Sequence, residues 1–139
     1  MNVLIDTNIV LDAMLARSPF KVEAQRLFLL TAEEKIHAFI TASSVTDIYY
    51  LLRKHIHSDI ECKQALFKLF ALFGIVDVTA DDCERALELP MADYEDALIA
   101  VCAKRAKIDY IITRNVKDFI KSPVKAISPS YFLENLLES

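Results

Sequence analysis

Three polar residues interrupt a short apolar run near the start of the chain. Asp6, Thr7 and Asn8 follow Val3–Ile5 directly, after which apolar residues resume. Such residues stop strands and cap helices, which is one interpretation of the stretch. The other is a functional site at the end of a strand, where a carboxylate meets further ligands from elsewhere in the chain.

Further acids and an amide are candidates for the same site, namely Asp47, Asp96, Asn115 and Asp118. Carboxylates that cluster raise one another's pKa unless a cation lies between them. Hard oxygen ligands without His or Cys select Mg²⁺ or Mn²⁺. If these residues meet, the predicted chemistry is therefore that of a hard divalent cation.

Each acid also has a simpler interpretation as a cap or a turn. The stretches 44–47 and 93–96 resemble capping boxes, in which the first residue and the fourth bond to each other's backbone. Asn8 could cap a helix, and Asp118 could form a turn in a loop. The elements that carry these residues decide between the two interpretations.

Short apolar runs alternate with longer helical patterns along the chain. The predicted strands are 2–5, 36–41, 74–78, 108–113 and a short fifth within 124–128. The predicted helices are 18–34, 43–56, 59–73, 79–89, 93–107 and 129–139, the first with Ser18 as its cap and Pro19 at its first position. This order predicts an α/β fold, a three-layer α/β/α sandwich around a parallel sheet of four or five strands, in a single domain over 1–139.

Ligands of such a sheet bind at the carboxyl ends of its strands. Asp6 ends the first strand, while Asp47 and Asp96 lie in the first turns of helices whose N-termini share that edge. Asn115 and Asp118 follow the fourth strand, so we expect Asp6, Asp96 and Asp118 to converge on one point bordered by Asp47. Asp12 lies a turn and a half into the next helix and is interpreted as a surface or helix charge.

The rest of the composition excludes several classes of protein. The three cysteines are widely spaced, which argues against a zinc knuckle or a disulfide framework, and His55 and His57 point apart on a helix. With Gly74 as the only glycine, no glycine-rich phosphate loop is present. The sequence has neither a membrane span nor a signal peptide pattern, so we expect a cytoplasmic protein.

The charge is unevenly distributed. The net charge of −4 argues weakly against a nucleic-acid partner. The stretch 104–125, however, contains seven bases and only two acids. Such a strip is able to bind phosphates while the remainder stays acidic, but the charge by itself favours the interpretation as a solvated surface.

Three blocks of the sequence resemble the PIN-domain ribonucleases, which include the toxins of many toxin–antitoxin pairs. These blocks are "LIDTNIVLD", "ASSVTDIYYLLRK" and "DYEDALIAVCAKRAKIDYIITRNVKDF", and their order and spacing match over essentially the whole chain. The resemblance implies a parallel sheet flanked by helices and a metal-dependent endoribonuclease. It also implies an antitoxin as a possible partner.

The resemblance assigns roles to individual residues. The first family acid corresponds to Asp6, the second, usually a glutamate, to Asp47, and the third to Asp96. Asp118 is preferred at the variable fourth position. Supporting roles fall to Thr7, Asn8, Asp93, Thr113 and Asn115. At this second position the chain has the shorter side chain of an aspartate.

The predicted reaction is hydrolysis of an RNA phosphodiester by water activated by Mg²⁺ or Mn²⁺. One or two ions are held by Asp6, Asp96 and Asp118. The RNA backbone is expected to contact Lys104, Arg105, Arg114 and Lys117. Two alternatives stay open: a non-catalytic PIN-like module that binds RNA or protein, and a phosphotransferase of the haloacid-dehalogenase type with Asp6 as nucleophile. The second expects an acid two residues after Asp6, where this chain has Asn8.

The helix predicted over 61–73 has more apolar residues than one buried face requires. Eight of its residues are apolar, at positions 65–67 and 69–73, which exceeds a stripe of about 100°. The stretch 48–52 is also apolar around its helix. We therefore expect a two-fold homodimer, against the alternative that these helices bury each other completely.

Overall fold

A computed structural model describes residues 1–137 of the 139-residue chain. Its strands are β1 (Asn2–Ile5), β2 (His37–Thr41), β3 (Gly74–Val76), β4 (Tyr110–Ile112) and β5 (Ala126–Ile127). Its helices are α1 (Thr7–Met14), α2 (Lys21–Ala32), α3 (Ala42–His55), α4 (Asp59–Leu72), α5 (Ala80–Glu88), α6 (Tyr94–Arg105) and α7 (Pro129–Tyr131). A 3₁₀ turn spans Val116–Phe119, and a π-helical turn spans Phe132–Leu136.

The strands described within residues 1–137 form one parallel sheet in the order β3-β2-β1-β4-β5. β1 is central, with Val3 opposite Ala38 on β2 and Tyr110 on β4. Both faces of a parallel sheet are covered by helices, so its central strand is a continuous apolar run. The run Val3–Ile5 has this form because it is buried on both sides.

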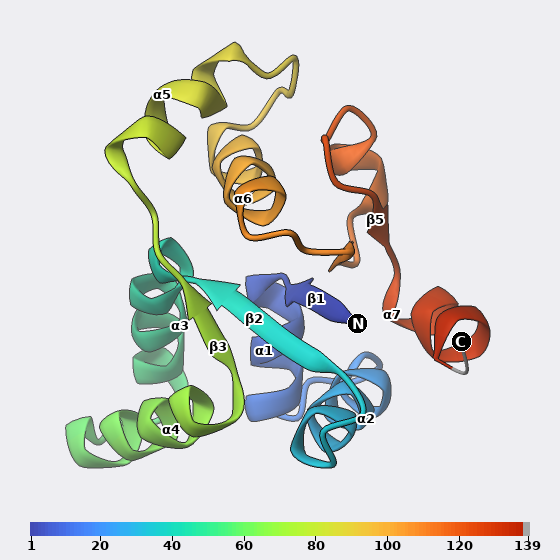
Figure 1. Cartoon of the computed structure of the whole chain (residues 1–139). Helices are drawn as coiled ribbons and strands as arrows, with labels where there is room; N and C mark the ends of the chain where they lie inside the picture. The colour runs from blue at the N-terminus through green and yellow to red at the C-terminus, as the bar shows by residue number, and fades with distance from the viewer. Residues whose placement is uncertain (138–139) are drawn as a thin grey trace.

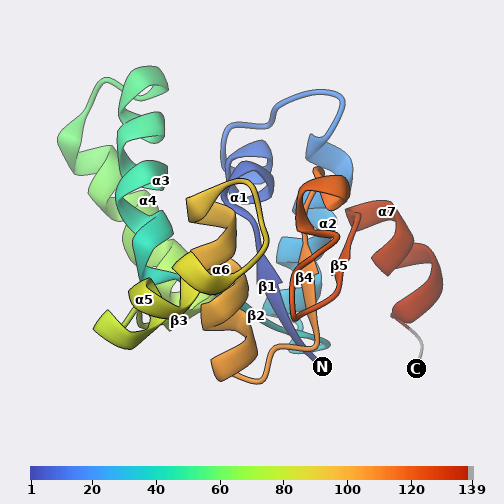
Figure 2. The ribbon, with the colours of Figure 1, turned by 90° about the horizontal axis from the view of Figure 1, so that it is seen from above.

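The two faces of β1 define two parts of the core. Val3 and Ile5 pack with residues of α1, α2, α3 and α4, whereas Leu4 packs with Ile99 and Ala100 of α6. Successive side chains of a strand point to opposite faces, which explains this division. Figure 1 shows α6 and α2 on opposite sides of β1, and Figure 2 shows α3 and α4 side by side, away from β5. The predicted three-layer α/β/α architecture is confirmed.

Several predicted boundaries are wrong. Pro19 follows a cis peptide bond, and α2 begins at Lys21, so Ser18 does not cap it. α3 begins at Ala42 directly after β2, which places Asp47 in the second turn rather than in a capping box. The predicted terminal helix consists of α7 and the π-helical turn, and its last two positions lie outside the described residues. That residues 1–139 form one domain stays a prediction.

Within residues 1–137, no helix has the length and apolar character needed to cross a membrane.

Candidate functional site

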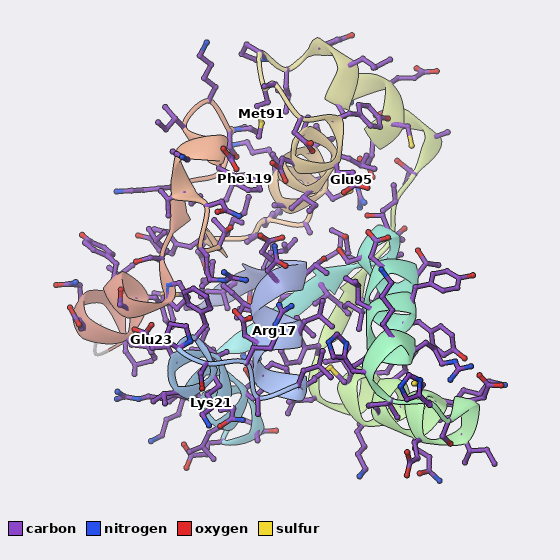
Figure 3. The ribbon with its side chains drawn as sticks, turned by 180° about the vertical axis from the view of Figure 1, so that it is seen from behind. Arg17, Lys21, Glu23, Met91, Glu95 and Phe119 are labelled. Carbon is purple, nitrogen blue, oxygen red and sulfur yellow. The ribbon has the colours of Figure 1, made fainter. Side chains whose placement is uncertain are left out.

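A cleft of about 690 Å³ opens at the carboxyl-end edge of the sheet, between α1, α3 and α6. Asp6, Asp47 and Asp96 line it, together with Asn115 from the segment after β4. The topology predicted that these residues would share one edge, and they do. Figure 3 shows the side chains of this region, with Glu95 labelled on α6 and Arg17 beside α1.

Asp6 is held at the junction of β1 and β4. It is the N-cap of α1, and its Oδ1 accepts a hydrogen bond of 2.9 Å from the Thr7 N–H. Its Oδ2 accepts one of 2.8 Å from the Thr113 hydroxyl, which is completely buried at the end of β4. The Asp6 N–H donates to the carbonyl of Ile112 at 3.0 Å. Asp6 therefore both caps a helix and presents a fixed carboxylate to the cleft, and the two interpretations of the sequence are compatible.

The acids of the cleft disfavour one another's ionisation. Burial raises the pKa of Asp6 and the nearby charge of Asp118 raises it further, against the opposing effects of the two hydrogen bonds and of Arg114. Burial also raises the pKa of Asp96, to about 6, with further contributions from Asp93, Asp6, Asp118 and Glu95. The mutual repulsion expected of clustered carboxylates is thus present at this edge.

The remaining acids take different positions around the cleft. Asp93 is the N-cap of α6, and its Oδ1 accepts from the Asp96 N–H at 3.0 Å, so the capping interpretation holds for this residue. Asp47 is exposed on the α3 wall. Asp118 lies on the exposed 3₁₀ turn outside the lining, although its charge acts on Asp6 and Asp96. Asn115 contributes to the lining itself.

Apart from Lys54, the polar side chains of the cleft provide carboxylate, amide and hydroxyl oxygens, and this donor chemistry fits a hard divalent cation. The predicted convergence on a single point is not seen: no three Asp, Glu, His or Cys side chains of residues 1–137 are arranged to hold a metal ion. Asp6 is fixed by two hydrogen bonds, whereas Asp118 lies on an exposed turn.

Two of the predicted RNA-binding residues lie at the wrong edge of the sheet. α6 begins at the cleft and runs antiparallel to the strands, so Lys104 and Arg105 lie at its far end, about 12–14 Å from Asp96 along the helix axis. Arg105 pairs there with Asp82 of α5, with an Nη2–Oδ2 distance of 2.8 Å. The direction of α6 thus separates Lys104 and Arg105 from the acids of the cleft.

The predicted roles of Arg114 and Asp12 also need correction. Asp12 is a buried residue and not a surface charge, with 1% of its side chain exposed. Arg114 pairs with it at 3.0 Å and stacks on Phe20, its guanidinium carbon lying 3.9 Å from the ring centroid. Arg114 is therefore engaged with Asp12 and Phe20 and is not among the residues that line the cleft. Lys117 stays a candidate for RNA binding, exposed on the 3₁₀ turn.

Sequence reasoning missed the wall that α3 contributes to the cleft. Ser43, Tyr50 and Lys54 line it, and Tyr94 lines it from α6. The three α3 residues lie at −4, +3 and +7 from Asp47, which is the spacing of one helix face. That spacing is visible in the sequence once Asp47 is taken as a member of the site.

Asp96→Asn is expected to stabilise the metal-free protein at neutral pH. The pKa of Asp96 is raised from 3.8 to about 6 in the folded state, so its charged form disfavours folding above that pH. Removing the charge should raise the free energy of unfolding at pH 7 by ~1–2 kcal/mol, after allowance for solvent screening. Thermal melts in chelator measure this gain, which should shrink as the pH falls through about 6 towards about 4. Glu88→Gln, outside the cleft, is the control, and an equal gain for Asp96→Asn at both ends of the pH range would contradict the interpretation.

The chain matches a known protein family. A family model described as PIN domain matches residues 2–117. The comparison with curated proteins finds no match.

Solved structures with the same fold include bacterial toxin–antitoxin proteins. A toxin–antitoxin complex from Klebsiella pneumoniae has a chain 25% identical to this one, with a TM-score of 0.67, covering 91% of this chain and 97% of that chain. VapBC2 from Rickettsia felis, bound to promoter DNA, is 20% identical with a TM-score of 0.69, covering 92% and 98%. VapC20 from Mycobacterium tuberculosis, described as a sarcin–ricin loop cleaving toxin, is 18% identical with a TM-score of 0.62, covering 78% and 86%.

Proposed function

This chain belongs to the PIN domain family, and from that premise we propose that it is a toxin ribonuclease that hydrolyses RNA phosphodiester bonds with Mg²⁺ or Mn²⁺. The observation that carries the proposal is the cleft in which Asp6, Asp47 and Asp96 lie on one edge of the sheet. The similarity to VapC20, which is described as a sarcin–ricin loop cleaving toxin, supports the choice of RNA as substrate.

The residues of the cleft have distinct roles in this proposal. Asp6, Asp96 and Asp118 would hold the cation, with Asp47 at the border of the same site. A bound ion supplies a water of lowered pKa and offsets the charge of the phosphate. Thr113 orients the Asp6 carboxylate through its 2.8 Å hydrogen bond, and the N-terminus of α1 favours the negative charge at Asp6. Asp93 fixes the first turn of α6 and thereby the position of Asp96.

An RNA cleavage assay with and without a chelator tests the proposal. Cleavage that stops with chelator and returns with Mg²⁺ or Mn²⁺ supports it. RNA binding without cleavage would favour a non-catalytic module. Transfer of phosphate to the protein would favour a phosphotransferase with Asp6 as nucleophile, a reading that Asn8 disfavours.

Lys54 is the expected RNA-binding residue of the cleft wall. Among the residues that line the cleft in the described part of the chain, it alone is basic, and it is exposed. Losing one phosphate contact should raise KM about tenfold in Lys54→Gln and lower its dependence on salt, because a single charge is removed. Initial rates at several salt concentrations measure both effects. Lys104→Gln is the control, since Lys104 lies at the other end of α6, and equal effects of the two variants would contradict the assignment.

The outer face of α4 supports the proposal of a homodimer. Ile60 and Phe67 lie seven residues apart on one helix face and are 70% and 72% exposed, and Phe70 is exposed beside them. Phe73, in contrast, is buried in the core. An exposed apolar stripe of this kind is typical of a protein–protein contact.

Phe67→Glu is therefore expected to weaken self-association at least about tenfold, because it puts a charge into the apolar contact. Sedimentation at micromolar concentrations measures the change. Leu87→Glu on α5 is a matched control, since Leu87 is 75% exposed. A wild-type chain that sediments as a monomer would remove the homodimer from the proposal.

An antitoxin is the second proposed partner. The similar structures from Klebsiella and Rickettsia are toxin–antitoxin assemblies. An apolar groove of about 310 Å³, between α1, α2 and α4, offers a seat for an apolar segment, with Met14, Phe28 and Leu69 among its lining. A neighbouring reading frame for a small protein with an apolar tail would agree with this partner. Location in the cytoplasm stays a prediction.

A further inference from the structure

Asp12 is a buried carboxylate with two arginine partners. Its Oδ1 lies 2.9 Å from the Nε of Arg17, and its Oδ2 lies 3.0 Å from the Nε of Arg114. Burying a carboxylate is unfavourable unless charged partners compensate for the lost water. The two partners differ in origin, because Arg17 follows α1 by three residues, whereas Arg114 comes from the segment after β4.

Arg17 by itself accounts for a structural role at the end of α1. Its backbone N–H donates to the Asp12 carbonyl at 3.0 Å, and its guanidinium also donates to the carbonyl of Asn8 at 3.0 Å. These contacts are local and join Arg17 to residues of α1 itself. They do not involve the segment after β4.

Arg114 connects Asp12 to that segment. Its guanidinium is held between the Asp12 carboxylate and the ring of Phe20. A planar guanidinium that both pairs with a carboxylate and stacks on a ring has a well-defined orientation. The backbone on either side of Arg114 is therefore fixed relative to α1.

The residues on either side of Arg114 belong to the candidate site. Thr113 donates its hydroxyl hydrogen bond to Asp6, and its hydroxyl oxygen accepts from the Asn115 N–H at 3.1 Å. Asn115 lines the cleft, and Asp118 lies three residues further on. A continuous series of contacts thus runs from Asp12 through Arg114 and Thr113 to Asp6.

We propose that Asp12 is a positioning residue: through Arg114 it anchors the turn 113–118, which presents Thr113, Asn115 and Asp118 to the site. Asp12 does not line the cleft, and its contact with the turn 113–118 is made through Arg114. The catalytic consequence rests on the proposed ribonuclease function, whereas the anchoring is a property of the structure itself. A displacement of about 1 Å at a reacting group is enough to lower a rate by about 100-fold.

Asp12→Asn tests the proposal, with Arg17→Gln as its matched control. Asp12→Asn breaks both ion pairs of Asp12 and so releases Arg114, whereas Arg17→Gln breaks only the local pair and leaves Arg114 paired with Asp12. Hydrogen exchange of the amides of 113–119, followed by mass spectrometry, is expected to rise at least about tenfold in Asp12→Asn and to stay near wild type in Arg17→Gln. For RNA cleavage, kcat should fall about 10- to 100-fold in Asp12→Asn with little change in KM, because Asp12 does not touch the substrate.

Arg114→Lys provides a second route if Asp12→Asn does not fold. It keeps the positive charge but loses the planar contact with Asp12 and Phe20, so exchange over 113–119 should rise here too. Unchanged exchange in the variant that folds would overturn the proposal, and so would equal losses of kcat in Asp12→Asn and Arg17→Gln. If the wild-type chain cuts no RNA, only the ribonuclease function fails, and the exchange comparison still decides whether Asp12 anchors the turn.

Discussion

Asp6→Asn is expected to abolish metal-dependent RNA cleavage while the fold persists. Asparagine has the same size as aspartate, and its carbonyl oxygen is able to accept the hydrogen bond from the Thr7 N–H that caps α1. The variant loses the negative charge that we assign to the cation site. Removing a central ligand of this kind should lower kcat by at least about 10³-fold.

Initial cleavage rates at saturating Mg²⁺ measure the loss of activity. Circular dichroism and thermal melts measure whether the fold persists. Asp81→Asn is a suitable control, because Asp81 is an exposed acid on α5 that pairs only locally with Arg85. In the absence of metal, Asp6→Asn should be at least as stable as wild type, since one member of a repelling cluster is gone. Cleavage at the wild-type rate would remove Asp6 from the site.

Arg105→Met is expected to give the largest loss of stability. Asp82, its partner, is 0% exposed and also accepts a 3.0 Å hydrogen bond from the Thr79 N–H. Pairing with Arg105 is the main reason that the pKa of Asp82 lies well below its usual range. Without Arg105, the buried carboxylate of Asp82 loses its paired cation. This loss should lower the free energy of unfolding by about 2–3 kcal/mol, which is a low value for a broken buried ion pair because Arg105 is partly exposed.

The pH dependence of this loss has a definite sign. Because the pKa of Asp82 is lowered on folding, the pair stabilises the protein above the ordinary aspartate pKa of about 4. The contribution is lost as the pH falls from there towards the lowered value of the folded state. The difference in the free energy of unfolding between wild type and Arg105→Met should therefore be largest at pH 7 and become smaller in acid.

Urea unfolding across this pH range measures the effect, with Lys104→Met as a control on the same turn of α6. At a temperature where Arg105→Met is folded, its RNA cleavage should match that of wild type. A raised KM with unchanged stability would instead restore the RNA-binding role that the sequence predicted for Arg105.

The sequence by itself determined the architecture and the shared edge of the principal acids. The short apolar run Val3–Ile5 and the longer helical patterns around it require a parallel sheet covered on both faces. Asp6 and Asp96 are 90 positions apart in the sequence, yet strand direction and helix direction suffice to bring them to the same cleft. Such features follow from periodicity and chain order, which are local properties of the sequence.

Only the tertiary structure decided which charged side chains are free to act. Arg114 and Asp12 meet across 102 positions, and Arg105 and Asp82 across 23, because helices and loops from different parts of the chain pack there. Neither pairing has a spacing that a helix or a strand repeats, so the basic strip 104–125 appeared continuous in the sequence. In the fold, two of its bases are held by buried carboxylates, and Lys54, from another helix, is the base that lines the cleft together with the acids. A buried carboxylate without a paired cation is unfavourable, and this free-energy cost is the reason that each arginine pairs with its buried aspartate.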